Sequence, residues 1–335
     1  MMMSAETRAT RASGRPEGTL QPARIAVFGS LNVDLVTRLR RFPAPGETVA
    51  ARSFAIYPGG KGANQAVACG RLGADVAMFG ALGNDVLAPR LRDSLDAAHV
   101  RLDAVAALDD VATGTADIWV DDRGENMIAI AEGANGRVDE AYVDDHVGAL
   151  AAAEYLLLQL EVPIRALAHL LSALPAAGGP RVILDPAPAL PLAELPLERV
   201  WLLTPNEHEL ATLTGLPTDS ESEVRAAAAR LAATTGVRAV LIKAGGRGAF
   251  LSEAGRFERL PGFPVRAVNT TAAGDAFNGA LAAALAGAVG EPLDFEDAVR
   301  FAHAAAALQV TRPGAQPALP ERGEVVGFLR EHSAA

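Results

Sequence analysis

The sequence has little of what several classes of protein require. Its single cysteine, Cys69, excludes an intramolecular disulfide framework and a multi-cysteine metal site. Acidic residues outnumber basic ones, 40 against 30, and the net charge of −10 argues against nucleic acid or an anionic membrane as the main partner. Apolar runs such as 280–290 are too short to span a bilayer. We therefore expect a cytoplasmic protein.

Familiar signatures of nucleotide and metal sites are also absent. The chain has no Gly-x-x-x-x-Gly-Lys-Ser/Thr loop, and no Gly-x-Gly-x-x-Gly run follows the first expected strand. The six histidines do not form a metal-type cluster. Any nucleotide site must therefore be built in another way.

The first residues differ in composition from the rest. Residues 1–22 are rich in Thr, Ser, Arg, Gly and Pro and lack the apolar stretch of a signal peptide, so we expect a disordered tail. Hydrophobic residues make up 50% of the chain, which is enough for a large core. We expect residues 23–335 to form a single α/β domain.

Strand and helix patterns alternate through most of that domain. Short apolar runs typical of buried parallel strands occur at 24–28, 76–81, 101–107, 155–160, 182–184, 200–203 and 239–242. Helix patterns occur at 85–98, 138–152, 165–174, 221–235, 295–310 and 323–331. This alternation predicts a doubly wound, mostly parallel sheet.

One region follows a different pattern. Residues 113–133 alternate between apolar and polar side chains around an Asp-Asp-Arg-Gly turn, which predicts a hairpin. We expect it to pair with a strand at 49–57. The lid segments would then be about 35–58 and 113–131, inserted beside the main sheet.

The stretch around Asp275 is the central functional motif of the sequence. A β-type segment at 263–268 leads into a turn of small residues, Ala272, Ala273 and Gly274, and then into a helix at 275–288. The first N–H groups of a helix have no internal partner and bear the positive end of its dipole, so this turn is a candidate anion site. Asp275 could simply cap the helix, or it could take a proton from a hydroxyl that attacks a bound phosphate.

Polar side chains gather where several expected strands end, which is the edge at which open α/β sheets bind ligands. Asn32 and Asp34 share one face if the chain there is extended, although an Asx turn would also explain them. Further donors and acceptors follow in the glycine-rich run at 59–64 and at another strand end. The candidate residues for holding a polyol are Asn32, Asp34, Lys61, Asn64 and Glu161.

Later strand ends offer candidates for a nucleotide and a metal. Asn206 and Glu209 could order water around Mg²⁺, or could be a helix cap with an acid in the first turn. The run 245–248, Gly-Gly-Arg-Gly, could wall a nucleotide slot or be an ordinary hairpin turn. His303 is a helix residue expected near the nucleotide rather than a base.

Taken together, these motifs resemble the ribokinase-type carbohydrate kinases over about residues 25–328. The matching runs, in chain order, are Gly29-Ser30-x-Asn32-x-Asp34, Gly59-Gly60-Lys61-Gly62-Ala63-Asn64-Gln65-Ala66, Gly124-Glu125-Asn126, Gly133-Ala134-Asn135, Asp185-Pro186-Ala187-Pro188-Ala189, Thr204-Pro205-Asn206-Glu207-x-Glu209, Ala272-Ala273-Gly274-Asp275-x-Phe277-x-Gly279 and Thr311-Arg312-x-Gly314-Ala315-Gln316-Pro317. The resemblance implies ATP- and Mg²⁺-dependent phosphorylation of D-ribose at its 5-hydroxyl. It also implies a three-layer α/β/α fold with a small β-sheet lid, which is typically the homodimer interface.

The resemblance assigns roles residue by residue. It makes Asp275 the base and the turn from Ala272 to Gly274 the anion hole. The implied sugar-binding residues are Asn32, Asp34, Gly60, Lys61, Asn64, Glu161 and Asp275. The implied ATP-binding residues are Asn206, Lys243, Gly245, Gly246, Gly248, Asn278 and His303. Asn206 and Glu209 would support Mg²⁺ indirectly.

The sequence departs from the family at a monovalent-cation site. The resemblance implies ligands for K⁺ at Asn269 and at backbone carbonyls near Thr271, Gln309, Arg312 and Gly314, with Ala318 nearby. The family normally has Asp where this chain has Asn269, and often a hydroxyl where it has Ala318. Because the formal countercharge is lost, we expect weaker K⁺ activation than is typical.

Two alternatives stay open on the sequence alone. The chain could be a related kinase for another pentose or a nucleoside, although the Gly-Gly-Lys-Gly-Ala-Asn-Gln and Gly-Glu-Asn runs favour ribose. It could also be a non-catalytic sugar-binding protein on the same fold, although Asp275 and the anion turn are intact.

Overall fold

A computed structural model describes residues 24–332, so the tail expected at 1–22 lies outside the described residues. Within that range the strands are β1 (Ile25–Phe28), β2 (Asn32–Arg38), β3 (Ser53–Gly59), β4 (Val76–Gly83), β5 (Arg101–Leu108), β6 (Gly114–Val120), β7 (Asn126–Ala131), β8 (Tyr155–Leu158), β9 (Arg181–Leu184), β10 (Val200–Leu203), β11 (Ala239–Lys243), β12 (Ala249–Glu253) and β13 (Arg256–Leu260). The α-helices there are α1 (Lys61–Arg71), α2 (Ala88–Ala97), α3 (Glu140–Ala151), α4 (Ile164–Ala173), α5 (Glu207–Thr214), α6 (Glu221–Thr235), α7 (Ala273–Leu285), α8 (Phe295–Val310) and α9 (Arg322–Glu331).

The main sheet has the strand order β13-β12-β11-β10-β9-β8-β1-β4-β5. Every neighbouring pair from β11 to β5 is parallel, whereas β12 and β13 form an antiparallel hairpin at one edge. The chain winds outward from β1 first to β4 and β5 and then the other way to β8. The predicted doubly wound, mostly parallel sheet is confirmed.

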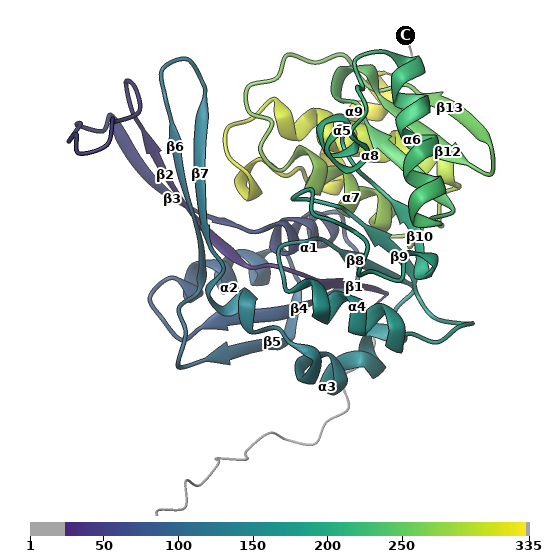
Figure 1. Cartoon of the computed structure of the whole chain (residues 1–335), viewed down its shortest axis with the longest axis horizontal. Coiled ribbons are helices and arrows are strands. Elements are labelled where there is room, and N and C mark those ends of the chain that lie inside the picture. Colours follow the sequence, from purple (N-terminus) through teal and green to yellow (C-terminus); the bar gives the residue numbers. More distant parts are fainter. Residues whose placement is uncertain (1–23, 333–335) are drawn as a thin grey trace, which may run out of the picture.

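Helices cover both faces of this sheet and give three layers (Figure 1). Along β1, Ile25 and Val27 pack into the core under α1, α2, α7, α8 and α9. Ala26 and Phe28 point the other way, into the core under α3, α4, α5 and α6. All four residues are apolar because a parallel strand between two helical layers is buried on both faces.

A second sheet stands beside the main sheet as a lid (Figure 1), with the order β3-β2-β6-β7. The predicted hairpin forms as β6 and β7, but its predicted pairing with the 49–57 strand was wrong. β2 lies between them, parallel to β6 and antiparallel to β3. Asn32 and Asp34 begin this central strand, so their extended conformation comes from pairing on both sides.

The other wrong prediction concerns the segments before α7. Residues 263–268 are not a strand, and Pro264, which has no N–H to donate to a ladder, lies among them. The strands there are instead β12 and β13, joined by a two-residue turn at Ala254 and Gly255 with positive φ angles of 49° and 82°. Such a turn is typical of tight hairpins, and the Ala-Gly pair was the signal that we missed.

No helix within residues 24–332 has both the length and the apolar character that crossing a membrane requires.

Candidate active site

The turn before α7 presents its backbone to a cavity. Ala272 is the N-cap residue and has φ 65° and ψ 12°, the left-handed conformation that residues other than glycine seldom adopt. The helix then starts at Ala273, two residues earlier than the sequence predicted. Gly274 and Asp275 therefore lie in the first helical turn, where N–H groups have no acceptor within the helix. The geometry is that of an anion site.

Asp275 is buried at this helix start, with 5% of its surface exposed. Its two oxygens accept hydrogen bonds from Asn64 Nδ2 at 2.9 Å and from Gln65 Nε2 at 3.2 Å. Burial raises the pKa of the carboxyl group, and the nearby Lys61 ammonium acts in the opposite direction. The arrangement holds a carboxylate with raised basicity in a fixed orientation.

Lys61 and Glu161 lie on the same side of Asp275. Glu161 accepts hydrogen bonds from the Lys61 backbone N–H at 3.0 Å and from the Ser30 hydroxyl. Burial opposes the charge on Lys61, but the carboxylates of Asp275, Asp185 and Glu161 outweigh it and raise the lysine pKa. The ammonium is therefore charged and surrounded by acidic groups.

Asp34 and Asn32 close this polar cluster from the lid. Burial, with the charges of Glu161 and Asp275, raises the pKa of Asp34 to about 7. The Asp34 carboxylate lies against Gly59, where a Cβ atom would come within 2.4 Å of it. Asn32 Oδ1 accepts a hydrogen bond from Asn135 Nδ2 at 2.7 Å. The structure thus brings together the predicted polyol-binding residues.

Two residues to which we gave no role connect the clusters. Gln65 Nε2 donates to Asp275 and also to Asp185 Oδ2 at 3.3 Å, and Gln65 Oε1 accepts from Gln159 Nε2 at 2.8 Å. Asp185 is ion-paired with Lys243, with Oδ1 and Nζ 2.9 Å apart. The missed signals were the position of Asp185 at a strand end and the four-residue spacing of Gln65 from Lys61 along α1.

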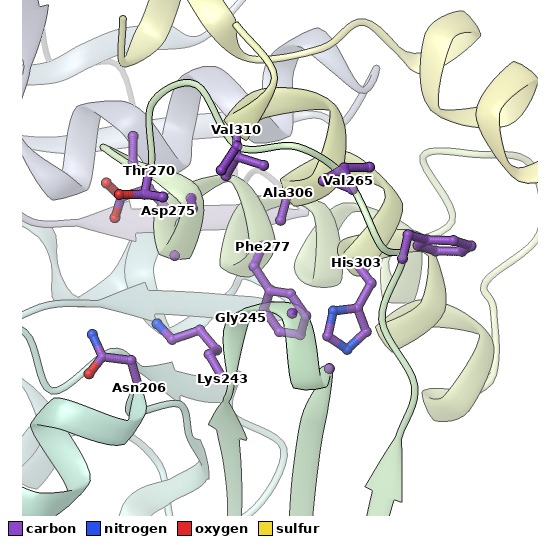
Figure 2. Close-up of a pocket in the computed structure, with 18 of the residues that line it drawn as sticks. Asn206, Lys243, Gly245, Val265, Thr270, Asp275, Phe277, His303, Ala306 and Val310 are labelled. Carbon is purple, nitrogen blue, oxygen red and sulfur yellow. The ribbon is translucent and has the colours of Figure 1, made fainter. Parts of the chain in front are cut away.

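A cavity of about 940 Å³ opens beside Asp275 (Figure 2). Predicted site residues in its wall are Lys61, Asn206, Glu209, Lys243, Gly245, Gly246, Gly248, Ala272, Ala273, Gly274, Asp275 and His303. Figure 2 shows Asp275 at one side of the cavity, with Phe277 and His303 further along it. A carboxylate, an anion site and an apolar slot therefore share one continuous space.

His303 suits the wall of that slot. Burial lowers the pKa of its imidazole to about 4, so the ring is neutral near pH 7. Its Nε2 has no hydrogen-bond partner within the described residues, and its ring packs edge-on against Phe277 at 5.1 Å. We predicted that Asn278 lines this wall, but its side chain is fully buried and does not reach the cavity.

Asn206 and Glu209 form a reciprocal cap at the start of α5. Asn206 Oδ1 accepts from the Glu209 N–H at 2.8 Å, and Glu209 Oε2 accepts from the Asn206 N–H at 2.7 Å. The cap, one of the two interpretations that the sequence allowed, is present. Both residues also line the cavity, so the cap fixes Glu209 facing it.

The residues expected around a monovalent cation converge but are already paired with each other. Asn269 Oδ1 accepts from the Thr271 N–H at 2.8 Å. The Gln309 side chain, rather than its carbonyl, faces the cluster and donates to the carbonyls of Thr271 and Gly314. The Arg312 guanidinium turns away to Glu324. The oxygens that a cation would need therefore already accept hydrogen bonds within the protein.

Comparisons with known proteins agree with this geometry. A family model described as pfkB family carbohydrate kinase matches residues 22–322. The chain is 38% identical to a ribokinase from Haemophilus influenzae, over 92% of this chain and 99% of that protein. It is 39% identical to a ribokinase from Bacillus subtilis, over 91% of this chain and 99% of that one. A structure of Arabidopsis thaliana ribokinase complexed with ribose and ATP matches with a TM-score of 0.84 and 34% identity, covering 92% of this chain and 99% of that chain.

Proposed function

The chain belongs to the pfkB family of carbohydrate kinases, and on that basis we propose that it transfers the γ-phosphoryl group of ATP to the 5-hydroxyl of D-ribose. The products are D-ribose 5-phosphate and ADP. The observation that supports this most directly is the buried carboxylate of Asp275 between a polar cluster and a cavity. A hydroxyl held by the cluster and a phosphate held in the cavity would meet at that carboxylate.

Asp275 is the proposed general base. Its pKa is raised by burial, which strengthens it as a base, and the amides of Asn64 and Gln65 fix its oxygens. It accepts the proton of the sugar hydroxyl as that oxygen attacks the terminal phosphorus in line with the leaving group. The simpler alternative, a helix cap, explains neither the burial nor the two amide donors.

The anion turn is the proposed oxyanion site. Gly274 and Asp275 lie in the cavity wall, and their N–H groups would stabilise the charge on the transferring phosphoryl group. Lys243 lies directly beside this turn, because a Cβ on Gly274 would be 3.1 Å from its Nζ, and it would add a positive charge there. Hydrogen bonds from groups already in place require little rearrangement during the reaction.

We call the polar cluster the sugar side of the cleft: Asn32, Asp34, Gly60, Lys61, Asn64 and Glu161. Side chains with both donors and acceptors suit the adjacent hydroxyls of a pentose. We call the opposite wall the nucleotide side: Gly245, Gly246, Gly248, Phe277 and His303. Its glycines and its apolar and neutral aromatic surfaces suit a purine base.

The cavity also suits the divalent cation that accompanies ATP. No cluster of three or more metal-ligating side chains occurs within residues 24–332. Mg²⁺ usually keeps several waters and uses one or two carboxylates together with substrate phosphates. Besides the proposed base Asp275, the carboxylates in the cavity wall are Asp185 and Glu209, which with Asn206 would hold the ion through water. Bound there, it neutralises phosphate charge.

We also propose that the lid forms a homodimer interface and that the enzyme is cytoplasmic. β7 is exposed along its whole length, and the lid strands present Phe54, Trp119, Met127, Ile128 and Ile130 to solvent. The strand register places Phe54, Trp119 and Met127 on one face of the lid and Ile128 and Ile130 on the other. Exposed apolar side chains on both faces support an interaction surface.

Substrate choice is tested by measuring ADP release with a panel of pentoses, hexoses and nucleosides. We expect the highest specificity constant for D-ribose. 5-Deoxy-D-ribose is the matched control, because it lacks the reacting hydroxyl and should bind competitively without turnover. A higher specificity constant for a nucleoside would show that the nucleoside, and not ribose, is the substrate. The absence of ATP-dependent turnover with every sugar would overturn the proposal.

A further inference from the structure

A buried glutamine ties the end of α8 to the anion turn. Gln309 is fully buried in the last turn of α8. Its Nε2 donates to the carbonyl of Thr271 at 2.5 Å and lies 3.4 Å from the carbonyl of Gly314. Thr271 immediately precedes Ala272, the left-handed residue that starts α7. The side chain therefore holds the carbonyl on which the shape of the anion turn depends.

The orientation of this amide follows from its neighbours. Both contacting atoms are carbonyl oxygens, which only accept hydrogen bonds, so the NH₂ group must face them. The other end, Oε1, has no hydrogen-bond partner within the described part of the chain. Rotating the amide by half a turn would place three oxygens together without a proton between them. The two donor contacts therefore decide how Gln309 lies.

This cluster of described residues also has no unpaired negative charge that a cation would have to neutralise. Asn269 contributes a neutral amide where a carboxylate would have supplied a negative charge, and its Oδ1 is occupied by the Thr271 N–H. The carbonyl of Gln309 accepts from the Arg312 N–H at 3.2 Å. The guanidinium of Arg312, the nearby cation, is paired with Glu324 and leaves no surplus negative charge.

We propose that the Gln309 side chain is a built-in, uncharged replacement for a monovalent cation at this position. It gathers the carbonyls of Thr271 and Gly314 as an ion would, but it does so permanently and without needing a countercharge. Asn269 and Gln309 are then matched: the neutral amide at 269 accompanies the neutral donor at 309. The anion turn is preorganised in the absence of K⁺. This inference rests on the proposed function only for its activity readout.

The first experiment compares the wild-type enzyme in KCl and in tetramethylammonium chloride at equal ionic strength. We expect the ratio of initial rates to stay below the roughly 5- to 150-fold range typical of coupled sites. We also expect equal melting temperatures in the two salts, because an ion that bound the folded state would stabilise it. Strong, saturable activation or stabilisation by K⁺ would show that Gln309 moves aside and would overturn the proposal.

The second experiment rebuilds the cation site in four proteins: wild type, Asn269→Asp, Gln309→Ala, and the double variant. Asn269→Asp alone should not bind K⁺, because the amide still occupies the carbonyls. Gln309→Ala should lose activity, and added K⁺ should restore only a little of it. The double variant has both a space and a countercharge, so it should gain K⁺-dependent activity within the range above. A double variant indifferent to K⁺, with a wild-type-like Gln309→Ala, would also overturn the proposal.

Gln316→Ala is the control for losing a buried glutamine. Its Oε1 accepts from the Ser94 hydroxyl of α2 at 2.6 Å, so its side chain contacts α2. This variant should change stability without creating K⁺ dependence. The melting temperatures need no turnover, so K⁺ stabilisation confined to the double variant would support the inference even if the proposed substrate were wrong. If Gln309→Ala does not fold, the comparison of the wild-type enzyme in the two salts still tests whether K⁺ binds.

Discussion

The two sides of the cleft are built on different principles. On the sugar side, charged and amide side chains from α1, β2 and the segment after β8 are fixed by hydrogen bonds with backbone and side-chain groups around them. On the nucleotide side, glycines and apolar surfaces leave open space, and the imidazole Nε2 of His303 has no partner among the described residues. In the proposed function, the first side would recognise the sugar by side-chain chemistry, and the second would recognise the nucleotide by the shape of its backbone.

This difference predicts how each side responds to substitution. A change at Glu161 or Asp275 alters the protonation of Asp34, because the charges of both residues raise the pKa of Asp34. A change on the nucleotide side should alter only the space available to ATP. The variants below test that distinction, beginning with the carboxylate where the two sides meet.

Asp275→Asn should reduce turnover by about 10²- to 10⁴-fold, the usual contribution of general-base assistance. The amide is close in shape to the carboxylate but cannot accept the hydroxyl proton. Ribose affinity, measured by calorimetry, should change little, because the remaining sugar-side residues are intact. Turnover near the wild-type rate would reduce Asp275 to a helix cap.

Gln65→Leu should act next most strongly, through the pKa of Asp275. Gln65 Nε2 donates to both Asp185 and Asp275, so its removal leaves two buried carboxylates without a shared donor. A hydrogen bond to a charged group contributes about 1.5–3 kcal/mol, and one pKa unit corresponds to about 1.4 kcal/mol. The acidic limb of the pH profile of kcat/KM should therefore move up by about 1–2 units.

Gln65→Glu is the informative companion, since it keeps the size of the side chain and adds a third carboxylate. Its acidic limb should lie higher still than that of Gln65→Leu. A merely structural role for Gln65 would lower stability in both variants and leave the pH profile in place.

Asp34→Asn should stabilise the protein at neutral and higher pH. The pKa of Asp34 is raised from its ordinary value of 3.8, which the unfolded chain retains, to about 7 in the folded chain, so the folded chain binds the proton more tightly. The free energy of unfolding therefore falls as pH rises from about 4 to 7, and this slope should disappear in Asp34→Asn. Above pH 7 the melting temperature of the variant should rise by roughly 2–4 °C for each kcal/mol gained in the free energy of unfolding.

The same variant should bind ribose more weakly, which separates stability from function. Asp117→Asn, an exposed carboxylate on the neighbouring strand β6, is the control and should leave both the melting profile and the ribose KM unchanged. A wild-type ribose KM in Asp34→Asn would show that Asp34 does not bind the sugar.

The sequence predicted the sugar side better than the nucleotide side for a physical reason. Asn64, Lys61 and Glu161 act through side-chain chemistry, which is visible in the residue types themselves. The left-handed Ala272, the hairpin of β12 and β13, and the burial of Asn278 depend on how the backbone packs. The positions of Gln65 and Asp185 were visible in the sequence, but their role depends on a contact between α1 and the end of β9 that only the fold creates.

Gly246→Ala should have the smallest effect and tests the nucleotide side alone. A Cβ at Gly246 would meet no atom within 4 Å, and its φ is not positive, so the fold should accept the methyl group. Gly248 is the matched contrast: its φ is 91°, and a Cβ there would lie 2.2 Å from the Leu260 carbonyl oxygen. Gly248→Ala should therefore lower the melting temperature.

For Gly246→Ala we expect the KM for ATP to rise a few-fold, with kcat, ribose KM and melting temperature unchanged. The methyl group narrows the wall of a cavity of about 940 Å³, in which a nucleotide has some room to shift. Initial rates with ATP and ribose varied independently, together with thermal melts of both glycine variants, provide the measurement. If Gly246→Ala instead changed the ribose KM as much as the ATP KM, the two sides would be coupled, and the distinction between chemical and shape recognition would fail.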